Sequence, residues 1–313
     1  MDWLRGAAAL MVCVFHIKKY VWGTAFPDFL TRIFDYGYLG VYVFFVVSGF
    51  VIPYSLDRAG YRTGMFFRFL YKRLTRIQPP FLLLMLLLLA WNYGLYEFKG
   101  WGKPWLFGWK KFLLNATYLA PFFHEKWVFS IFWTLGVEFQ FYLLTGLLFV
   151  TLRDRRRIRY VVYAVILCLD FMVPHRLETV FHHYVFFAIG FQSFLFHTGK
   201  ISLKEFMASV VAGLAYATLF ELPEAALVTG LTVAGVFIFR IRTGISAFFG
   251  DISYSLYLSH GLAGSAVAIF TAGRLSGWSR FGLAVGVSIA FATLFRALVE
   301  KRFIRLSKRI PLG

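Results

Sequence analysis

Cysteine and charged residues are scarce in this sequence. Its only two cysteines, Cys13 and Cys168, lie in apolar stretches and show no paired spacing. This argues against a disulfide framework and against a cysteine-based metal site. Charged residues make up 15% of the chain, whereas a soluble globular domain typically carries about 25%. The low charge content therefore argues against a soluble protein.

Apolar residues dominate the chain instead. Hydrophobic residues account for 59% and aromatic residues for 21%, and the mean hydropathy is +0.68. Apolar runs near the length that crosses a bilayer recur throughout, which is typical of a polytopic membrane protein. We therefore predict an all-α fold of about ten transmembrane helices, with residues 1–313 forming a single membrane-embedded domain and no appended soluble domain. The predicted spans cover residues 4–21, 37–56, 80–96, 129–150, 160–174, 180–197, 207–220, 224–240, 247–271 and 282–302.

The net charge of +18 is distributed as short clusters between the apolar runs. Clusters in such places set membrane topology and meet lipid headgroups, so we do not expect nucleic-acid binding. With the N-terminus inside, the predicted cytoplasmic segments hold roughly twice as many lysines and arginines as the outer segments. Both termini are therefore predicted to be cytoplasmic.

The first predicted span carries an ionisable residue near each end, Arg5 and His16. On a helix these two residues lie about 16 Å apart along the axis, which is roughly half of a bilayer core. An ionisable residue inside a membrane helix is by default a functional-site hypothesis. The alternative is a signal anchor in which Arg5 sits at the interface and His16 points outward.

The second span contains Ser48 and Gly49, followed by Pro53. This combination weakens a helix and predicts either a helix that lines a cavity or a notch where small residues pack. Residues 59–78 do not read as a span. Their basic residues predict an amphipathic helix on the cytoplasmic interface that binds either anionic lipid or a phosphate group. These basic residues include Arg68, Lys72, Arg73 and Arg76.

The external stretch 97–128 is rich in tryptophan, which predicts membrane anchoring and, as an alternative, stacking on a sugar ring. The fourth span follows it and carries Trp133, Glu138 and Tyr142. Glu138 and Tyr142 are four residues apart and share a helix face. A glutamate at membrane depth needs a partner, and we expect His16 to be that partner.

The ninth span places Ser253, Tyr257 and His260 along one side of a helix. Such a polar stripe is expected to face the interior of the helix bundle, although interhelical hydrogen bonding alone also explains many stripes. The tenth span ends with Arg296 and Glu300, which the spacing allows to pair with each other.

Five motifs in one order resemble the acyltransferase-3 family of integral membrane O-acyltransferases. They are Leu4-Arg5-Gly6 with His16, Phe44-Phe45-Val46-Val47-Ser48-Gly49-Phe50, Arg73-Leu74-Thr75-Arg76-Ile77-Gln78-Pro79, Trp133-Thr134-Leu135-Gly136-Val137-Glu138-Phe139-Gln140-Phe141-Tyr142, and Ser253-Tyr254-Ser255-Leu256-Tyr257-Leu258-Ser259-His260. The chain departs from the family at Phe139, where many members carry a second glutamate.

The resemblance implies an O-acetyltransferase in a bacterial cytoplasmic (inner) membrane. It would move an acetyl group from cytoplasmic acetyl-CoA to a hydroxyl of exopolysaccharide, lipopolysaccharide or a lipid-linked glycan precursor. In this interpretation His16 is the general base and Glu138 stabilises the imidazolium that forms. The donor would be held by Arg5, Arg68, Lys72, Arg73 and Arg76, and the acceptor-side cavity would be lined by Ser48, Trp133, Tyr142, Ser253, Tyr257 and His260.

The expected partners are thus acetyl-CoA, a carbohydrate or glycolipid acceptor and membrane lipids, and we expect neither a metal ion nor a permanently bound cofactor. A transporter or flippase for a lipid-linked glycan is the alternative, because it also needs polar groups within a helix bundle. Transporters often contain two corresponding halves. This chain has no second copy of the spacing between Arg5 and His16 or between Trp133 and Glu138.

Overall fold

The computed structural model describes residues 1–22, 28–99, 108–238 and 243–311, and within these ranges the chain forms helices and no strands. Each of the ten predicted spans coincides with a helix or with consecutive helical segments. The chain divides into two compact units. The first unit comprises Met1–Val41, Thr75–Leu106 and Arg240–Ser307, and the second comprises Tyr42–Leu74, Phe107–Phe239 and Lys308–Gly313.

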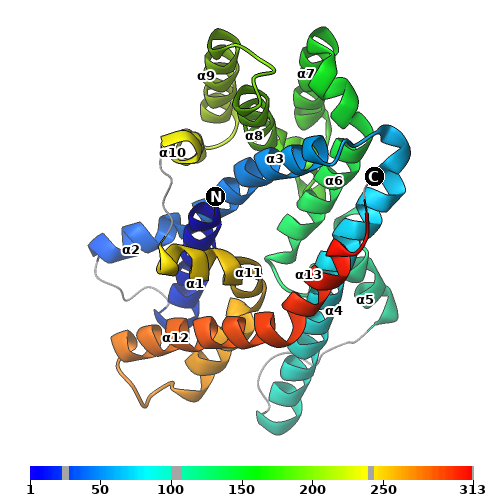
Figure 1. The fold of residues 1–313 in the computed structure, drawn as a ribbon. Coiled ribbons are helices and arrows are strands. Elements are labelled where there is room, and N and C mark those ends of the chain that lie inside the picture. Colours follow the sequence, from blue (N-terminus) through cyan, green and yellow to red (C-terminus); the bar gives the residue numbers. More distant parts are fainter. Residues whose placement is uncertain (23–27, 100–107, 239–242, 312–313) are drawn as a thin grey trace. The chain divides into compact units, whose positions relative to one another are not determined.

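The first unit is built on the packing of α1 along α11, with α12 also against α11 (Figure 1). Two glycines allow α1 and α11 to cross closely. A Cβ atom added at Gly250 would lie 2.4 Å from the Cβ atom of Asp2, and one added at Gly6 would lie 2.7 Å from that of Phe249. The elements of this unit are α1 (Asp2–Trp22), α2 (Asp28–Asp35), η1 (Tyr36–Leu39), most of α4 (Phe66–Lys99), α11 (Gly244–Phe270), α12 (Gly277–Phe295), the π-helical turn η6 (Arg296–Glu300) and α13 (Lys301–Lys308).

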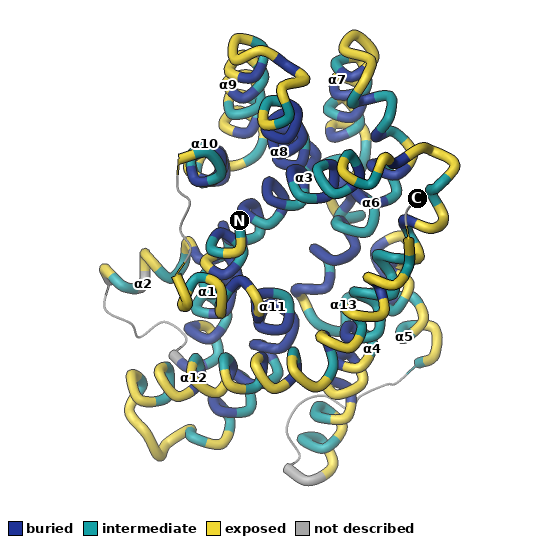
Figure 2. Tube along the Cα trace, in the orientation of Figure 1, coloured by how far each residue is buried: buried dark blue, intermediate teal, exposed yellow. Residues whose placement is uncertain are grey.

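The second unit packs its helices around α8, most of whose residues are buried (Figure 2). Its aromatic side chains interlock in this core, as where the rings of Phe141 and Phe187 stack 4.1 Å apart. Its elements are most of α3 (Gly40–Arg58), η2 (Thr63–Met65), the start of α4, α5 (Trp109–Ala116), η3 (Ala120–Phe123), α6 (Phe132–Asp154), α7 (Arg156–Met172), η4 (His175–Leu177), η5 (Val180–His183), α8 (Tyr184–His197), α9 (Leu203–Phe220) and α10 (Pro223–Ile238).

Large apolar side chains are exposed on several helices, including Leu219 at 73% and Leu227 at 67%. An apolar surface of this kind is suited to contact with lipid. Five segments are long and apolar enough to cross a membrane, namely Arg32–Arg58, Thr63–Glu97, Phe132–Asp154, Leu203–Phe220 and Gly277–Lys308. The chain is therefore an integral membrane protein, and the full set of ten spans and the cytoplasmic termini remain predictions.

The structure differs from the prediction of a separate interfacial helix over residues 59–78. Residues from Phe66 onward form one helix with the predicted third span, through Pro79 and Pro80. Proline removes a backbone donor from the helix, and such turns persist in membrane helices when neighbouring groups supply replacement hydrogen bonds. The carbonyls that lose their intrahelical donor to Pro79 and Pro80 are those of Thr75 and Arg76. The Tyr254 hydroxyl donates to the next carbonyl, that of Ile77, at 2.9 Å.

Candidate functional site

His16 meets His260 inside the first unit. His16 Nδ1 lies 3.2 Å from His260 Nε2, and the two rings are 5.0 Å apart between centroids. His16 is half-buried on α1, and His260 is fully buried on α11. The histidine therefore does not point away from the unit, as the signal-anchor alternative required.

Hydrogen bonds to two carbonyl groups determine which ring nitrogens carry protons. His260 Nδ1 lies 3.0 Å from the Leu256 carbonyl, and His16 Nδ1 lies 3.0 Å from the Val12 carbonyl. A carbonyl only accepts, so both Nδ1 atoms are donors. In the neutral pair, His16 Nδ1–H then also faces the lone pair of His260 Nε2. The lone pair of His16 consequently resides on Nε2, which is the nitrogen that can take a proton.

Glu138 lies in the second unit, on α6, where two hydroxyl groups bind its carboxylate. Tyr142 donates to Oε1 at 2.5 Å, and Ser48 on α3 donates to the same oxygen at 3.2 Å. The sequence placed Glu138 and Tyr142 on one helix face, and the two side chains do contact each other. It did not relate Ser48 to Glu138. The predicted pairing of Glu138 with His16 stays a prediction, because the two residues belong to different units. Phe139, at the family's second glutamate position, packs on the Tyr118 ring at 5.4 Å.

The segment around Ser48 and Gly49 forms the packing notch that the sequence offered as one of two alternatives, and its cavity-lining role stays a prediction. A Cβ atom at Gly49 would lie 2.2 Å from the Phe187 carbonyl oxygen, and one at Gly190 would lie 2.1 Å from that of Val46. Gly49 is thus a packing notch against α8, while its neighbour Ser48 binds the Glu138 carboxylate. Pro53 does not interrupt α3.

The polar stripe of α11 is buried, and its members have different partners. Ser253 donates to the Gly250 carbonyl of its own helix at 2.7 Å, so this hydroxyl has a hydrogen-bond partner without any ligand. Tyr257 lies with its ring 6.3 Å from that of His260. Ser255, which the sequence did not single out as a site residue, donates to Glu300 at 2.6 Å.

The suggested pair of Arg296 and Glu300 forms no direct ion pair, although the charge of Arg296 acts on the Glu300 carboxyl group. Arg296 binds Asp251 instead, at 2.7 Å. Glu300 is buried at the end of the π-helical turn η6, and the charges of Arg5 and Arg76 act on its carboxyl group. Both residues belong to the π-helical turn, which bonds residues five apart, so α-helical spacing does not align Arg296 with Glu300. Two of the predicted donor-binding arginines are therefore grouped in the first unit.

The other three predicted donor-binding residues lie in the second unit, at the start of α4. Arg73 is held over the rings of Phe69 and Tyr142, with its guanidinium 5.5 Å and 5.7 Å from the ring centroids. Lys72 donates to the Ile310 carbonyl at 2.8 Å. Arg68 is exposed. Arg73 and Lys72 thus have structural contacts of their own.

Trp133 lines an open hollow of about 660 Å³ in the second unit, a size within the range of about 300–1,000 Å³ for ligand pockets. Two indoles and charged groups of both signs surround it. Its lining residues are Pro121, His124, Glu125, Lys126, Trp127, Ser130, Trp133, Arg176 and Glu178. All of them fall in or beside segments that the sequence places outside the membrane.

The hollow is held in shape by hydrogen bonds around Trp127. The Trp127 indole N–H donates to the Glu178 carboxylate. The buried Asn115 side chain binds the backbone of both neighbours of Trp127, accepting from Val128 N–H at 2.8 Å and donating to the Lys126 carbonyl at 3.3 Å. Burial raises the pKa of Glu178, and the Trp127 hydrogen bond partly opposes that rise. Glu178 therefore takes up a proton at a higher pH than an ordinary glutamate.

One comparison with known proteins gives a match. The model of the acyltransferase-3 family, described as an acyltransferase domain, matches residues 1–297. That range includes both histidines, Glu138 and the hollow at Trp133. No curated protein and no solved structure matches the chain.

Proposed function

Because the chain belongs to the acyltransferase-3 family, we propose that this integral membrane acyltransferase transfers an acetyl group from acetyl-CoA to a hydroxyl of an extracytoplasmic carbohydrate. The observation that carries the proposal is the bonding of His16, whose Nδ1–H faces the Val12 carbonyl and His260 while Nε2 keeps the lone pair. A neutral imidazole held in one tautomer is suited to general-base catalysis near neutral pH.

In the proposed reaction, His16 Nε2 takes the proton of the acceptor hydroxyl as its oxygen attacks the thioester carbonyl carbon. The carbon–oxygen bond forms, the carbon–sulfur bond breaks, and the CoA thiolate leaves. His16 then returns the proton to that sulfur. His260 accepts from His16 Nδ1–H and acts as a positioning residue. Glu138 supplies a negative charge that favours the imidazolium form of His16.

We propose that the cytoplasmic arginines hold the phosphates of acetyl-CoA, because guanidinium groups bind phosphate oxygens in pairs. Arg76 is the sharpest test of this role. It lies within electrostatic range of Glu300, whereas Arg73 is already engaged over two aromatic rings. A guanidinium that only balanced Glu300 would contribute to stability and not to donor binding.

Replacing Arg76 by Ala should raise the KM for acetyl-CoA by roughly 10- to 100-fold with little change in kcat, because a charge-assisted hydrogen bond of about 1.5–3 kcal/mol is lost from ground and transition states together. Arg76→Lys keeps the charge beside Glu300 but loses the planar fork, so its KM should also rise. Steady-state kinetics at varied acetyl-CoA checks both variants. The matched control is Arg302→Ala, an exposed arginine of the same unit. An unchanged donor KM with a lowered melting temperature would assign Arg76 to stability alone.

We propose that the hollow at Trp133 receives the carbohydrate acceptor. The flat face of an indole packs against the apolar face of a sugar ring, and its N–H remains a polar handle. The charged side chains around the hollow offer hydrogen bonds to hydroxyl groups. An anchoring tryptophan would face lipid, whereas Trp127 is bound to Glu178 and lines the hollow.

Replacing Trp133 by Ala should raise the KM for the acceptor about tenfold, corresponding to about 1.4 kcal/mol of binding, while the donor KM stays unchanged. Trp133→Phe keeps a stacking surface and should recover much of the loss. Trp109→Ala removes an exposed tryptophan that does not line the hollow and serves as the control. Acetyl transfer at varied acceptor concentration measures the effect. Equal losses for Trp133→Ala and Trp109→Ala would contradict the assignment.

Turnover of acetyl-CoA by the purified protein distinguishes an acetyltransferase from a flippase. With a glycan acceptor present, we expect release of free CoA together with an alkali-labile acetyl ester on the glycan. Mass spectrometry of surface glycans from cells with and without this chain identifies the modified sugar. Glycan transport without CoA release would support the flippase alternative.

A further inference from the structure

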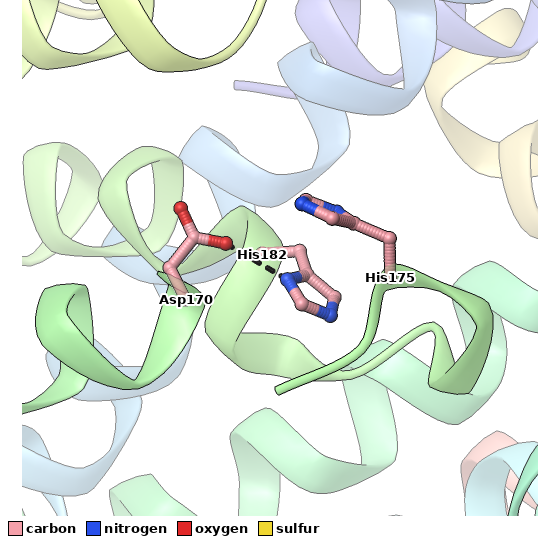
Figure 3. A group of neighbouring side chains, drawn as sticks. All are labelled: Asp170, His175 and His182. Atoms are coloured by element: carbon pink, nitrogen blue, oxygen red, sulfur yellow. Dashed lines mark hydrogen bonds and ion pairs between the residues drawn. The ribbon is translucent and has the colours of Figure 1, made fainter. Parts of the chain in front are cut away.

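Three side chains that can bind metal, none of them assigned above, converge in the second unit. Asp170 lies near the end of α7, His175 begins η4, and His182 lies in η5 (Figure 3). One candidate ligand atom from each lies within 4.8 Å of the others. His182 Nδ1 is 2.8 Å from Asp170 Oδ1, and the rings of His175 and His182 stack with centroids 4.3 Å apart.

Burial distinguishes this cluster from a surface ion pair. The side chains of Asp170 and His182 are only 5% and 4% exposed, so water does little to stabilise the Asp170 carboxylate. The Tyr216 hydroxyl donates to its other oxygen, Oδ2, at 2.6 Å. A ligand oxygen oriented by a further hydrogen bond is typical of metal sites. His175 is exposed and leaves one side of the cluster accessible.

His182 has no second hydrogen bond that fixes its tautomer. Its Nε2 is buried and has no hydrogen-bond partner within the part of the chain that the structure describes. A cation bound between His182 and Asp170 would take the place of the hydrogen bond between Nδ1 and Oδ1, with the ring proton on Nε2. Nδ1 then presents its lone pair toward the Asp170 oxygen and His175, where a cation would be bound.

We propose that Asp170, His175 and His182 bind a divalent transition-metal ion of the Zn²⁺ class, with the accessible side leaving a fourth position for water. Two imidazoles and one carboxylate are ligands that suit zinc and its neighbours. Because the ligands lie on α7, η4 and η5, the ion would fasten the connection between α7 and α8. No sequence pattern related these three residues to one another, and we expected no metal ion. The inference is independent of the proposed acetyl transfer.

The test is titration of chelator-treated, detergent-purified full-length protein with Zn²⁺, followed by calorimetry and by elemental analysis after desalting. We expect one ion per chain. His175→Ala removes an exposed ligand, and we expect it to lower the Zn²⁺ affinity at least tenfold without loss of folding. Tyr216→Phe leaves all three ligands in place but removes the hydrogen bond to the Asp170 carboxylate, so it should weaken Zn²⁺ binding by about 10- to 100-fold.

His124→Asn is the matched control, because His124 is an exposed histidine of the same unit. Its backbone is in the left-handed region, which asparagine tolerates. It should bind Zn²⁺ like the unmodified chain. Co²⁺ should give the visible absorption bands of a low-coordinate site in the unmodified chain and in the control, and lose them in His175→Ala. Equal Zn²⁺ affinity in His175→Ala and the unmodified chain would overturn the proposed ligand set. No stoichiometric binding at all would show that Asp170 and His182 form only a hydrogen-bonded pair.

Discussion

Replacing His16 by Ala is expected to lower kcat by 10²- to 10⁴-fold, the usual contribution of a general base. The protein should still fold and bind acetyl-CoA, because the imidazole is only half-buried and its hydrogen-bonding contact with His260 is a local one. The measurement is acetyl transfer per mole of monodisperse protein, together with the melting temperature and acetyl-CoA binding. A His16→Ala variant that retains most of its turnover would overturn the mechanism.

His16→Asn separates base catalysis from a structural role more sharply. An asparagine amide N–H can take the place of Nδ1–H and donate to His260, but nothing in the side chain replaces the lone pair of Nε2. If His16 is the base, His16→Asn should be as inactive as His16→Ala. If His16 matters only through its contact with His260, His16→Asn should be more active than His16→Ala. The two variants should also differ in stability, with His16→Asn closer to the unmodified chain.

The helices were predictable because long apolar runs separated by charged clusters leave few alternatives in a chain this hydrophobic. The pair of Glu138 and Tyr142 was predictable for a similar reason, since helix periodicity places residues four apart on one face. The predicted interfacial helix ended at residue 78, directly before Pro79, and proline usually ends a helix. The hydrogen bond from the Tyr254 hydroxyl on α11 to the Ile77 carbonyl joins distant segments, so a local sequence pattern does not predict it.

Contacts between distant segments account for what the sequence missed. His16 and His260 were both singled out, yet periodicity relates only neighbours on one helix and could not pair them. Glu300 was assigned to Arg296 by spacing, but the π-helical turn and the partner Asp251 place the two residues differently. Asp170, His175 and His182 come together because a short connection folds back on α7. No pattern of residues in the sequence predicts this fold-back.

Replacing Glu138 by Gln is expected to lower kcat by a smaller factor than His16→Ala, about 10- to 100-fold. Glutamine keeps the shape and can still accept from Tyr142 and Ser48, but it lacks the charge that favours an imidazolium. Donor and acceptor KM values should change little, because the charge matters in the transition state. Kinetics of the monodisperse variant measures this, and Phe139→Leu, a change at the neighbouring residue packed on Tyr118, is the control.

The double variant of His16→Ala with Glu138→Gln decides whether the two residues act as a unit. If Glu138 works by stabilising protonated His16, its replacement should cost almost nothing once His16 is gone, because there is no imidazolium left to stabilise. The double variant should then be about as slow as His16→Ala alone. If the two losses multiply instead, Glu138 acts independently, through the bonds that it makes with Tyr142 and Ser48. In that case the predicted partnership of His16 with Glu138 is wrong, and His260 is the remaining partner of the base.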